Sequence, residues 1–454
     1  MFTILFIFFL FSNILLKIQS NTNYTESLEI VAQFNVIKFE INSQIVECRN
    51  CMPAGIKLSK NGDIFCSFPR WYENVTATFA KFNEINNTFE PWPSYEYNTK
   101  YEYSNPSGLN SVLGFEIDDE NFLYILDQGK INGEEALEGA IKVLKFSLDN
   151  NALIREYIFD EEIADRNRSF LNDIVIDKKR HLAYISDSGK DKNKNFKPGI
   201  IVLDLEDPTY IHRILENHPS VYPDESFWLH IDKKPVHEND PMLTGVDGIA
   251  LSCNGETLFF CPLTGRMIYS VLTSDIEDAI KKNKTDEIKV YHGFKKEASD
   301  GLLASSKGNL YMTGIETGSV YIYKEIEQDL LRFDYKEFDG FEGNTSTMWP
   351  DTLAFHKGYL YFVSNQLNNF PKYINYTNPV NGKYNFAILK IKVENDDSYI
   401  KGCTGFGNEW GIGSIIIWIC FAVIILIVLS FVLMGSNNQE EVIDKHMNLG
   451  IKED

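Results

Sequence analysis

Six segments of the chain share one hydrophobic pattern: a small residue or glycine, a short apolar run, a polar turn and a second apolar run. They begin at Met52, Val112, Leu171, Val246, Ser299 and Pro350. Each segment has the length of two β-strands around a tight turn, and one such unit cannot bury its own apolar face. Small sheets repeated around a common axis solve this problem, so the pattern predicts a β-propeller.

The spacing of the repeats predicts the number of blades. Equivalent positions are Gly55, Gly114, Asp173, Gly248, Gly301 and Thr352, which gives spacings of 59, 59, 75, 53 and 51 residues. Each interval holds about four strands with their loops, which is one propeller blade. We therefore expect an all-β fold with six blades, and the longest interval predicts extra loops on the third blade at 190–197 and 218–235.

Closure of the propeller requires its two ends to meet. The runs LEIVAQFNVIKFEI from Leu28 and YNFAILKIKV from Tyr384 both have β-type patterns, and we expect them to share a blade. A pair of unrelated β-sandwiches is the alternative, but sandwiches do not repeat one phrase six times.

Two apolar segments outside the repeats predict the topology. The first, MFTILFIFFLFSNILL from Met1, is too short for a comfortable membrane span and is followed by Gln19 and Ser20, which indicates a secretory signal. Because Lys17 lies late in this N-terminal segment, an uncleaved membrane anchor is the alternative. Residues 412–434 carry no charge and would extend about 34 Å as a helix, enough to cross a bilayer. The predicted divisions are a signal peptide at 1–20, the propeller at 21–400, a juxtamembrane linker at 401–411, a transmembrane helix at 412–434 and a cytoplasmic tail at 435–454.

This organisation predicts a single-pass type I membrane protein of the secretory pathway, with an extracellular or luminal propeller. Seven Asn-X-Ser/Thr sequons fit that placement and predict a glycoprotein. Their asparagines are Asn23, Asn74, Asn86, Asn167, Asn283, Asn344 and Asn375.

The formal net charge of −21 argues against nucleic-acid binding, because a nucleic-acid interface must neutralise phosphates with Lys and Arg. It favours cationic small molecules or metal ions as ligands, although acidity also serves solubility alone.

Of the seven cysteines, Cys420 lies inside the expected membrane span, and the other six form an even set suited to an oxidising compartment. Cys253 and Cys261 flank the turn Asn254-Gly255, so we predict a disulfide across one hairpin. The Cys48-X-X-Cys51 pair lies in no thioredoxin-like pattern, which favours a structural bridge or free thiols over catalysis.

One repeat position predicts a ring of side chains. The residues just before the equivalent positions are Ala54, Leu113, Asn172, Asp247, Asp300 and Asp351. Because the innermost strand of every blade lines the central channel, this position should recur around the axis. Four of the six carry oxygen, and converging carboxylates need a cation, a basic ligand, water or protons between them.

We therefore predict a ligand site at Asn172, Asp247, Asp300 and Asp351, in which Asn172, Asp247 and Asp300 are candidate ligands for Ca²⁺. The alternative is that each Asp caps a turn by accepting the backbone amides that follow it. Trp71, Trp92, Tyr95, Tyr97, Tyr101 and Tyr103 gather between the first two repeats, and an aromatic wall beside carboxylates would suit a protonated arylalkylamine.

The phrases MPAGIKLSKNGDIFCSFPRW from Met52, LNDIVIDKKRHLAYISDSG from Leu171, IIVLDLED from Ile200 and DGIALSCNGETLFFCPLTGRMIYSV from Asp247 resemble the yellow and major royal jelly protein family over most of residues 30–393. The resemblance implies a secreted six-bladed propeller with a ligand pocket at one end of its channel. It also implies binding of biogenic amines, melanin-pathway chemistry on dopachrome, or a nutritive role. The C-terminal span departs from the usual family pattern.

A more distant resemblance, to gluconolactonase and regucalcin-type propellers, implies a divalent metal held by Glu, Asn, Asn and Asp of four blades. Asn172 and Asp300 match this set and Asp247 nearly matches, but Ala54 stands where the Glu would be. Other catalytic motifs are absent from the sequence, with no HExxH and no Gly-X-Ser-X-Gly.

Three functions remain as expectations. The first is a membrane-anchored propeller that binds a small cationic or aromatic ligand of the biogenic-amine type, without turnover and with no catalytic residue assigned. The second is an enzyme of the dopachrome-conversion or metal-dependent lactonase type. The third is a cell-surface recognition module that uses the outer faces of the blades.

Overall fold

The structure is a computed structural model that describes residues 28–404 apart from 103–104, 192, 194, 232, 324–336, 342–348, 371, 373, 378–383 and 394–395. The compact unit of the fold ends at Cys403. The predicted signal peptide at 1–20, transmembrane helix at 412–434 and tail at 435–454 lie outside the described residues. Within the described part of the chain, no helix combines the length and the apolarity needed to cross a bilayer.

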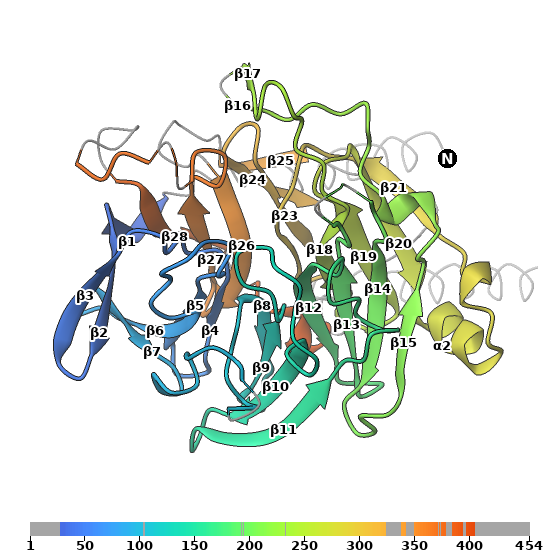
Figure 1. The fold of residues 1–454 in the computed structure, drawn as a ribbon. Helices are drawn as coiled ribbons and strands as arrows, with labels where there is room; N and C mark the ends of the chain where they lie inside the picture. The colour runs from blue at the N-terminus through green and yellow to red at the C-terminus, as the bar shows by residue number, and fades with distance from the viewer. Residues whose placement is uncertain are drawn as a thin grey trace, which may run out of the picture. The chain divides into compact units, whose positions relative to one another are not determined.

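Six antiparallel sheets form the blades of a propeller, as the repeat predicted (Figure 1). Blade 1 contains β4 (Ile56–Leu58), β5 (Ile64–Ser67), β6 (Phe79–Asn83) and β7 (Thr88–Pro91), with β2 (Ile37–Ile41) and β3 (Gln44–Cys48) added at its outer edge. Blade 2 contains β8 (Val112–Ile117), β9 (Phe122–Asp127), β10 (Lys142–Ser147) and β11 (Ala152–Ile158). Blade 3 contains β12 (Leu171–Asp177), β13 (Leu182–Asp187), β14 (Gly199–Asp204) and β15 (Ile211–Ile214).

The remaining blades follow the same order from the axis outward. Blade 4 contains β18 (Val246–Leu251), β19 (Thr257–Pro262), β20 (Met267–Leu272) and β21 (Tyr291–Lys295). Blade 5 contains β22 (Leu302–Ala304), β23 (Leu310–Gly314), β24 (Ser319–Tyr323) and β25 (Glu337–Phe341). Blade 6 contains β26 (Trp349–His356), β27 (Tyr359–Asn365), β28 (Phe386–Lys392) and β1 (Glu29–Phe34).

The propeller closes in blade 6, where strand β1 pairs antiparallel with β28. This confirms that the runs from Leu28 and Tyr384 share a blade. The second half of the N-terminal run has a different place, because β2 joins blade 1 through a parallel pairing of Phe39 with Phe89 of β7.

The predicted extra loops of the third interval are present. The loop between β13 and β14 of blade 3 carries a bridge between Lys190 and Phe196. The connection from blade 3 to blade 4 contains the 3-10 helix η1 (Pro219–Val221) and the two-stranded ribbon of β16 (His230–Ile231) and β17 (Lys234–Pro235). The described helices are α2 (Thr273–Lys281), η2 (Thr285–Glu287) and η3 (Tyr399–Lys401), besides η1.

The innermost strands approach one another closely around the axis, and glycine makes this possible. A Cβ on Gly114 would lie 2.4 Å from the carbonyl oxygen of Asn172 in the next blade, and a Cβ on Gly301 would lie 2.5 Å from that of Asp351. At the same repeat position the strand register shifts in β8, β12, β18 and β26. Such β-bulges change the direction of side chains, so they help to aim the ring residues.

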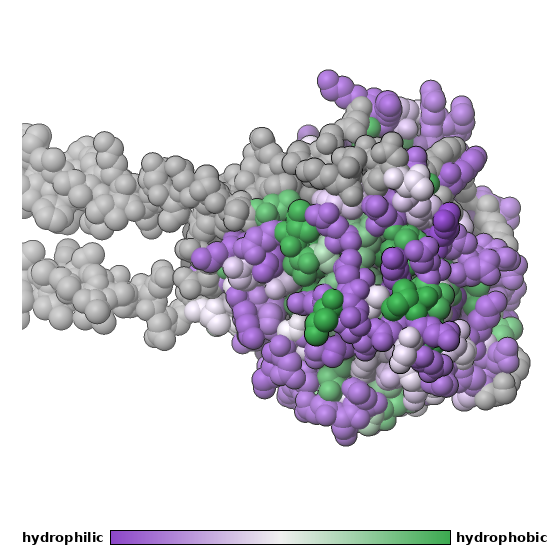
Figure 2. Space-filling view, turned by 90° about the vertical axis from the view of Figure 1, so that its left-hand side faces the viewer, coloured by the Kyte–Doolittle hydropathy of each residue, from purple (hydrophilic) through white to green (hydrophobic). Residues whose placement is uncertain are grey.

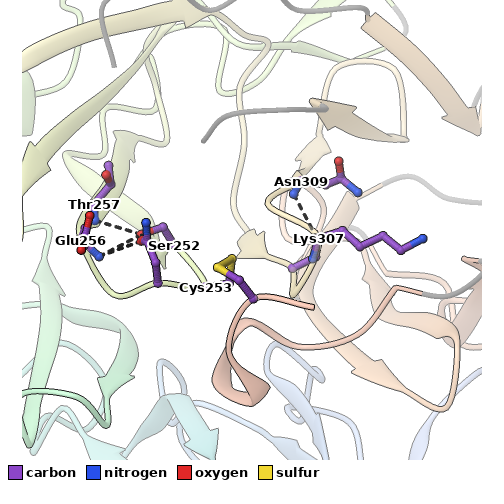
Figure 3. The surroundings of a disulfide bond; sticks show 9 residues. Ser252, Cys253, Glu256, Thr257, Lys307 and Asn309 are labelled. Atoms are coloured by element: carbon purple, nitrogen blue, oxygen red, sulfur yellow. Dashed lines mark hydrogen bonds between the residues drawn. A yellow bond between two sulfur atoms is a disulfide. The ribbon is translucent and has the colours of Figure 1, made fainter. Parts of the chain in front are cut away.

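The predicted disulfide between Cys253 and Cys261 is wrong. Cys253 is bonded to Cys403 and Cys48 to Cys51, while Cys261 and Cys66 are buried free thiols. The hairpin register is the reason: Leu251 pairs with Leu258 and Ile249 with Phe260, so Cys253 lies in the turn and Cys261 toward the other end of the hairpin. Figure 3 shows the turn, where Ser252 Oγ accepts the backbone amides of Glu256 and Thr257, beside the disulfide to the C-terminal segment.

The outer surface near β1–β3 is mainly hydrophilic, with separate hydrophobic spots (Figure 2). Exposed large apolar side chains in this part of the chain include Ile30, Ile45, Val46 and Ile85. Scattered apolar groups are normal on a protein surface, so no docking surface is assigned here.

We expect peptide mapping without reduction to recover the link between Cys253 and Cys403. Replacing both cysteines with Ala should lower the free energy of unfolding by about 2–5 kcal/mol, because the bond closes a loop of about 150 residues in the unfolded chain. The matched control, Ala at Cys48 and Cys51, removes a bridge of sequence separation 3 and should cost about 1–2 kcal/mol. Recovery of a Cys253–Cys261 link would contradict this pairing.

The described sequon asparagines Asn74, Asn86, Asn167, Asn283 and Asn375 are all exposed. They can therefore accept glycan if the chain enters the secretory pathway. We expect an endoglycosidase to increase the gel mobility of the chain purified from a eukaryotic host. The variant with all five replaced by Gln should show a smaller increase, and an unchanged mobility of the parent chain would count against an extracytosolic propeller.

Candidate functional site

The four polar ring residues come together at the start of the innermost strands. Asn172 lies on β12, Asp247 on β18, Asp300 just before β22 and Asp351 on β26. The side-chain amide of Asn172 donates to Asp247 Oδ2 at 2.5 Å, and the carboxyl groups of Asp247 and Asp300 share a hydrogen bond. The predicted convergence of these residues is therefore present in the fold; their role as ligands stays a prediction.

The turn-capping alternative assigns the backbone amide at each equivalent repeat position to the carboxylate before it. At Gly301 a hydroxyl takes this place: Thr313 Oγ1 accepts the amide at 3.0 Å. Ser67 Oγ accepts the amide of Gly55 in the same way at 2.8 Å. The carboxylate of Asp300 therefore interacts with other side chains.

Two donors that the sequence analysis missed hold the ring carboxylates. The indole Nε1 of Trp349 donates to Asp300 Oδ2 at 2.5 Å, and Asn365 Nδ2 donates to Asp351 Oδ2 at 2.8 Å. Trp349 and Asn365 are directly paired across strands β26 and β27. Trp349 lies outside the six repeat segments, whereas Asn365 is the last residue of the sixth. The sequence therefore pointed only to Asn365, and it placed this residue at the end of the second strand of the blade and not on the innermost strand.

Burial raises the pKa of all three ring carboxyl groups. For Asp247 the charges of Asp300 and Asp351 add to this effect, and its pKa lies well above the usual value. Burial also raises the pKa of Asp351 well above the usual value, and the charge of Asp300 raises it further. Burial raises the pKa of Asp300 to about 6, although the Trp349 hydrogen bond and the nearby ammonium of Lys296 act in the opposite direction. These raised pKa values favour protons or another positive charge in the cluster near neutral pH.

Asp173 adds a fourth carboxyl group to the channel, at a position where most repeats have glycine. Burial raises its pKa to about 7, the charges of Glu116 and Asp300 add to this, and Lys57 opposes it. Lys57 and Glu116 themselves form a buried ion pair with an Nζ–Oε2 distance of 3.0 Å. In the sequence, Asp173 is only the third equivalent position of the repeat, which gives no sign of this chemistry.

The C-terminal segment 396–403, which we call the plug, closes the other end of the innermost strands. Tyr399 is buried, and its hydroxyl accepts the backbone amide of Ile176 at 2.9 Å. Asn309 Nδ2 and Tyr311 Oη both donate to Asp396 Oδ2 at 2.8 Å. With the disulfide of Cys403, these contacts attach the plug to blades 3, 4 and 5.

Most of the aromatic residues between the first two repeats pack in the core rather than beside the ring. Trp92 contacts Phe65, Phe79 and Phe146, and Tyr97 also contacts Phe146. Tyr101 lies under the ammonium of Lys142, at 4.7 Å. Tyr95 is exposed, and Tyr103 lies outside the described residues.

Trp71 is the member of this group with a link toward the ring. It stacks on Phe170 with ring centroids 6.1 Å apart, and its indole Nε1 donates to Gln128 Oε1 at 3.4 Å. Gln128 in turn donates to the carbonyl oxygen of Leu171, next to Asn172.

The donor set does not fit a calcium shell of six to eight oxygens. Ala54 and Leu113 contribute no side-chain oxygen, and one oxygen each of Asp300 and Asp351 is engaged by an N–H donor. Within the described ranges, no group of three or more His, Cys, Asp or Glu side chains could hold a metal ion. Binding of Ca²⁺ by Asn172, Asp247 and Asp300 therefore stays a prediction, and no chemical step is derived from it.

A nucleophile is not evident beside the ring. The thiol of Cys261 lies near Asp300 and Lys296, but burial raises its pKa, so it is protonated at neutral pH. The ammonium of Lys296 donates to the carbonyl oxygens of Gly265 and Glu297, each at 2.9 Å, which gives it a structural role.

The family model described as "Major royal jelly protein" matches residues 110–399. Major royal jelly protein 3 of Apis mellifera is 20% identical over 314 residues, which cover 65% of this chain and 54% of that protein. Major royal jelly protein 7 of Apis mellifera is 23% identical over 280 residues, which cover 57% of this chain and 59% of that protein. The matches thus span little more than half the length of these relatives.

Among solved structures, the calcium-binding protein regucalcin of Agrobacterium tumefaciens is similar, with a TM-score of 0.44 and 10% identity. The similarity covers 82% of this chain and 97% of that one.

The raised pKa values predict that the fold loses stability as the pH rises from about 4 to 7. In this window the folded state binds more protons than the unfolded state, because Asp300 and Asp173 titrate at about 6 and 7 instead of 3.8. Asp300→Asn should raise the free energy of unfolding at pH 7.5 by about 1–3 kcal/mol and change it little at pH 4.

Urea unfolding followed by tryptophan fluorescence at the two pH values measures this difference. Asp286→Asn removes an exposed charge outside the ring and is the matched control, with little effect expected at either pH. Equal destabilisation by Asp300→Asn at both pH values would contradict a buried, mutually repelling cluster.

Proposed function

Because the chain belongs to the major royal jelly protein family, we propose that its propeller binds a small cationic or aromatic molecule of the biogenic-amine type at Asn172, Asp247, Asp300 and Asp351. One observation carries the proposal. Three carboxyl groups share a single buried cluster, and their charges repel one another when the groups are ionised. An ammonium group could replace the protons that the cluster otherwise needs.

The surroundings of the cluster suit an ammonium group on an apolar body. At about 4 Å and an effective dielectric constant near 20, one carboxylate–ammonium pair contributes on the order of 4 kcal/mol before desolvation. Micromolar binding therefore also needs apolar contact. The buried residues Leu113 and Ala54 complete the ring, and the indole of Trp349 touches Asp300, so an aromatic body has surfaces to pack against.

We place this function on the extracytosolic side of a membrane. The apolar segments 1–20 and 412–434 support a signal peptide and a single span, and the exposure of five sequon asparagines supports passage through the secretory pathway. The net charge of −21 supports small-molecule ligands over nucleic acid.

A second candidate function is proton-transfer catalysis, such as tautomerisation of a dopachrome-like quinone. It is favoured by Asp173, whose pKa of about 7 suits a group that accepts and returns a proton at neutral pH. Asp173 also keeps intermediate exposure, so a small molecule in the channel could approach it.

Calorimetric titration of the full-length chain with serotonin tests the first proposal. We expect binding that weakens at least tenfold in Asp300→Asn and does not change in Asp286→Asn. 5-Hydroxytryptophol, which differs from serotonin only in a hydroxyl in place of the amine, should bind at least tenfold more weakly. Affinity for serotonin should increase from pH 5.5 to 8, because the carboxyl groups with raised pKa must lose protons to receive the ammonium.

Equal affinity for serotonin and 5-hydroxytryptophol, or an affinity for serotonin that falls as the pH rises, would contradict the amine site. Two further arms of the same experiment separate the other functions. If the addition of Ca²⁺ gives a heat signal and Asp300→Asn abolishes it, the result would support Asn172, Asp247 and Asp300 as metal ligands. If the chain causes dopachrome absorbance to decay and Asp173→Asn abolishes this decay, the result would support proton-transfer catalysis. The absence of any signal with serotonin, Ca²⁺ or dopachrome would favour a recognition module.

A further inference from the structure

A separate cavity lies among loops of blades 1 and 2, and no ring residue lines it. Its volume is about 440 Å³, within the range of about 300–1,000 Å³ that is typical of small-molecule sites. Its lining comes from within three connections: 70–76 between β5 and β6, 95–100 between β7 and β8, and 131–134 between β9 and β10. Asn74 and Thr76, the first and third residues of one predicted glycosylation sequon, both line this cavity, which we call the sequon pocket.

The sequon lies on a loop that is held in place. Asn50 Nδ2 donates to the carbonyl oxygen of Glu73 at 2.7 Å, and Arg70 Nε donates to that of Val75 at 3.4 Å. Asn74 itself is exposed and has a φ of 62°, which asparagine adopts more readily than most residues. A sugar attached to Asn74 would therefore start from a defined position beside the sequon pocket.

The floor of the sequon pocket does not require an ion. The buried guanidinium of Arg70 donates to the carbonyl oxygens of Leu109 at 2.6 Å and Asn110 at 2.8 Å. Burial lowers the pKa of Arg70 to about 10, and the nearby charge of Asp127 opposes this effect. The charged side chains of the lining are two of each sign: Arg70, Lys100, Glu73 and Glu134. A neutral polar group therefore suits this cavity better than an ion.

The remaining lining suits a sugar. Thr76, Thr99 and Asn132 line the pocket with hydroxyl and amide groups. Such groups form hydrogen bonds with the hydroxyl and acetamido groups of N-acetylglucosamine. Tyr72 and Tyr95 add aromatic rings, and Tyr95 is 43% exposed. The negative face of an aromatic ring attracts the weakly positive C–H groups of a sugar.

From this lining and the position of the sequon, we propose that the sequon pocket holds the first sugars of an N-linked glycan on Asn74. The transfer would form a bond between Asn74 Nδ2 and C1 of the first N-acetylglucosamine. It would break the bond from C1 to the diphosphate of a lipid-linked oligosaccharide, and the amide proton and the lipid diphosphate would leave.

Attachment makes the contact between sugar and pocket intramolecular. The sugar then has a high effective concentration at the pocket, so individually weak contacts are enough to hold it. The held glycan would connect loops of blades 1 and 2. This arrangement requires that the chain passes through the secretory pathway, but it does not depend on the amine site, because the two sites share no residue.

Site-resolved deglycosylation tests the arrangement. The full-length chain from a eukaryotic host is treated with peptide N-glycosidase while folded, and mass spectrometry follows each asparagine. We expect glycan removal from Asn74 to be at least tenfold slower than from Asn283. Asn283 is the matched control, because it is also exposed, has a similar φ of 52° and lies outside the lining. After urea unfolding the two rates should be equal.

A substitution in the pocket locates the contact. Tyr95→Ser removes an aromatic ring of the lining, so removal from Asn74 should become at least threefold faster while the rate at Asn283 does not change. Ile154→Ser, on the outer strand β11, is the matched substitution and should affect neither rate. Because Tyr95 is 43% and Ile154 50% exposed, unchanged urea unfolding of both variants should confirm that they fold.

Hydrogen exchange gives a second readout. Asn74→Gln should increase the amide exchange of residues 95–100 and 131–134, because the glycan no longer covers these loops. Asn283→Gln should leave their exchange unchanged.

Equal removal rates from Asn74 and Asn283 in the folded chain would overturn the proposal. So would an unglycosylated Asn74 in a chain that carries glycan at Asn283, or an unchanged rate in Tyr95→Ser. A chain with no glycan at any asparagine would contradict both this proposal and the extracytosolic placement. None of these results would affect the binding of serotonin at the ring, which calorimetry measures independently.

Discussion

The close contact of the innermost strands around the axis is the constraint on which the rest of the structure depends. Gly114 and Gly301 allow the backbone of one blade to touch the ring carbonyl of the next, and no larger residue fits there. Hydroxyl groups add to the closure: Ser67 Oγ donates to the carbonyl of Leu113 at 2.7 Å, and Ser186 Oγ donates to that of Asp247 at 2.6 Å. Residues far apart in the sequence become neighbours because of these contacts.

This geometry has an electrostatic consequence. A ring position that is polar in four blades concentrates carboxyl groups in a space with little water, and burial then favours their neutral form. Under the proposed function, a cation bound at this end of the strands would replace those protons. At the other end, Lys57 and Glu116 neutralise each other and Tyr399 of the plug is buried, so the two ends differ in charge.

The fold and the ring were predictable from the sequence because both follow from a repeat. One phrase in six copies predicts six blades, and a shared position within the phrase predicts which side chains converge. The disulfide was not predictable in this way, since the proximity of Cys253 and Cys403 depends on where a nonrepeated C-terminal segment folds back. Proximity in the sequence favoured Cys261, but the hairpin register places it away from the turn.

The chemistry of the ring also needed more than the repeat. Trp349 and Asn365 lie on neighbouring strands of blade 6, and only the pairing of those strands brings them to Asp300 and Asp351. The raised pKa of Asp173 depends on burial together with Lys57, Glu116 and Asp300 from three other blades, which no single phrase contains.

We propose that the carboxyl groups of Asp247 and Asp351 carry protons at neutral pH until a cation replaces them. Infrared difference spectroscopy of the unliganded chain against Asp247→Asn observes this state directly, through the C=O stretch of a protonated carboxyl group. We expect such a band at pH 7 and its loss on addition of serotonin. A spectrum at pH 7 that shows only ionised carboxylate at this position would contradict it.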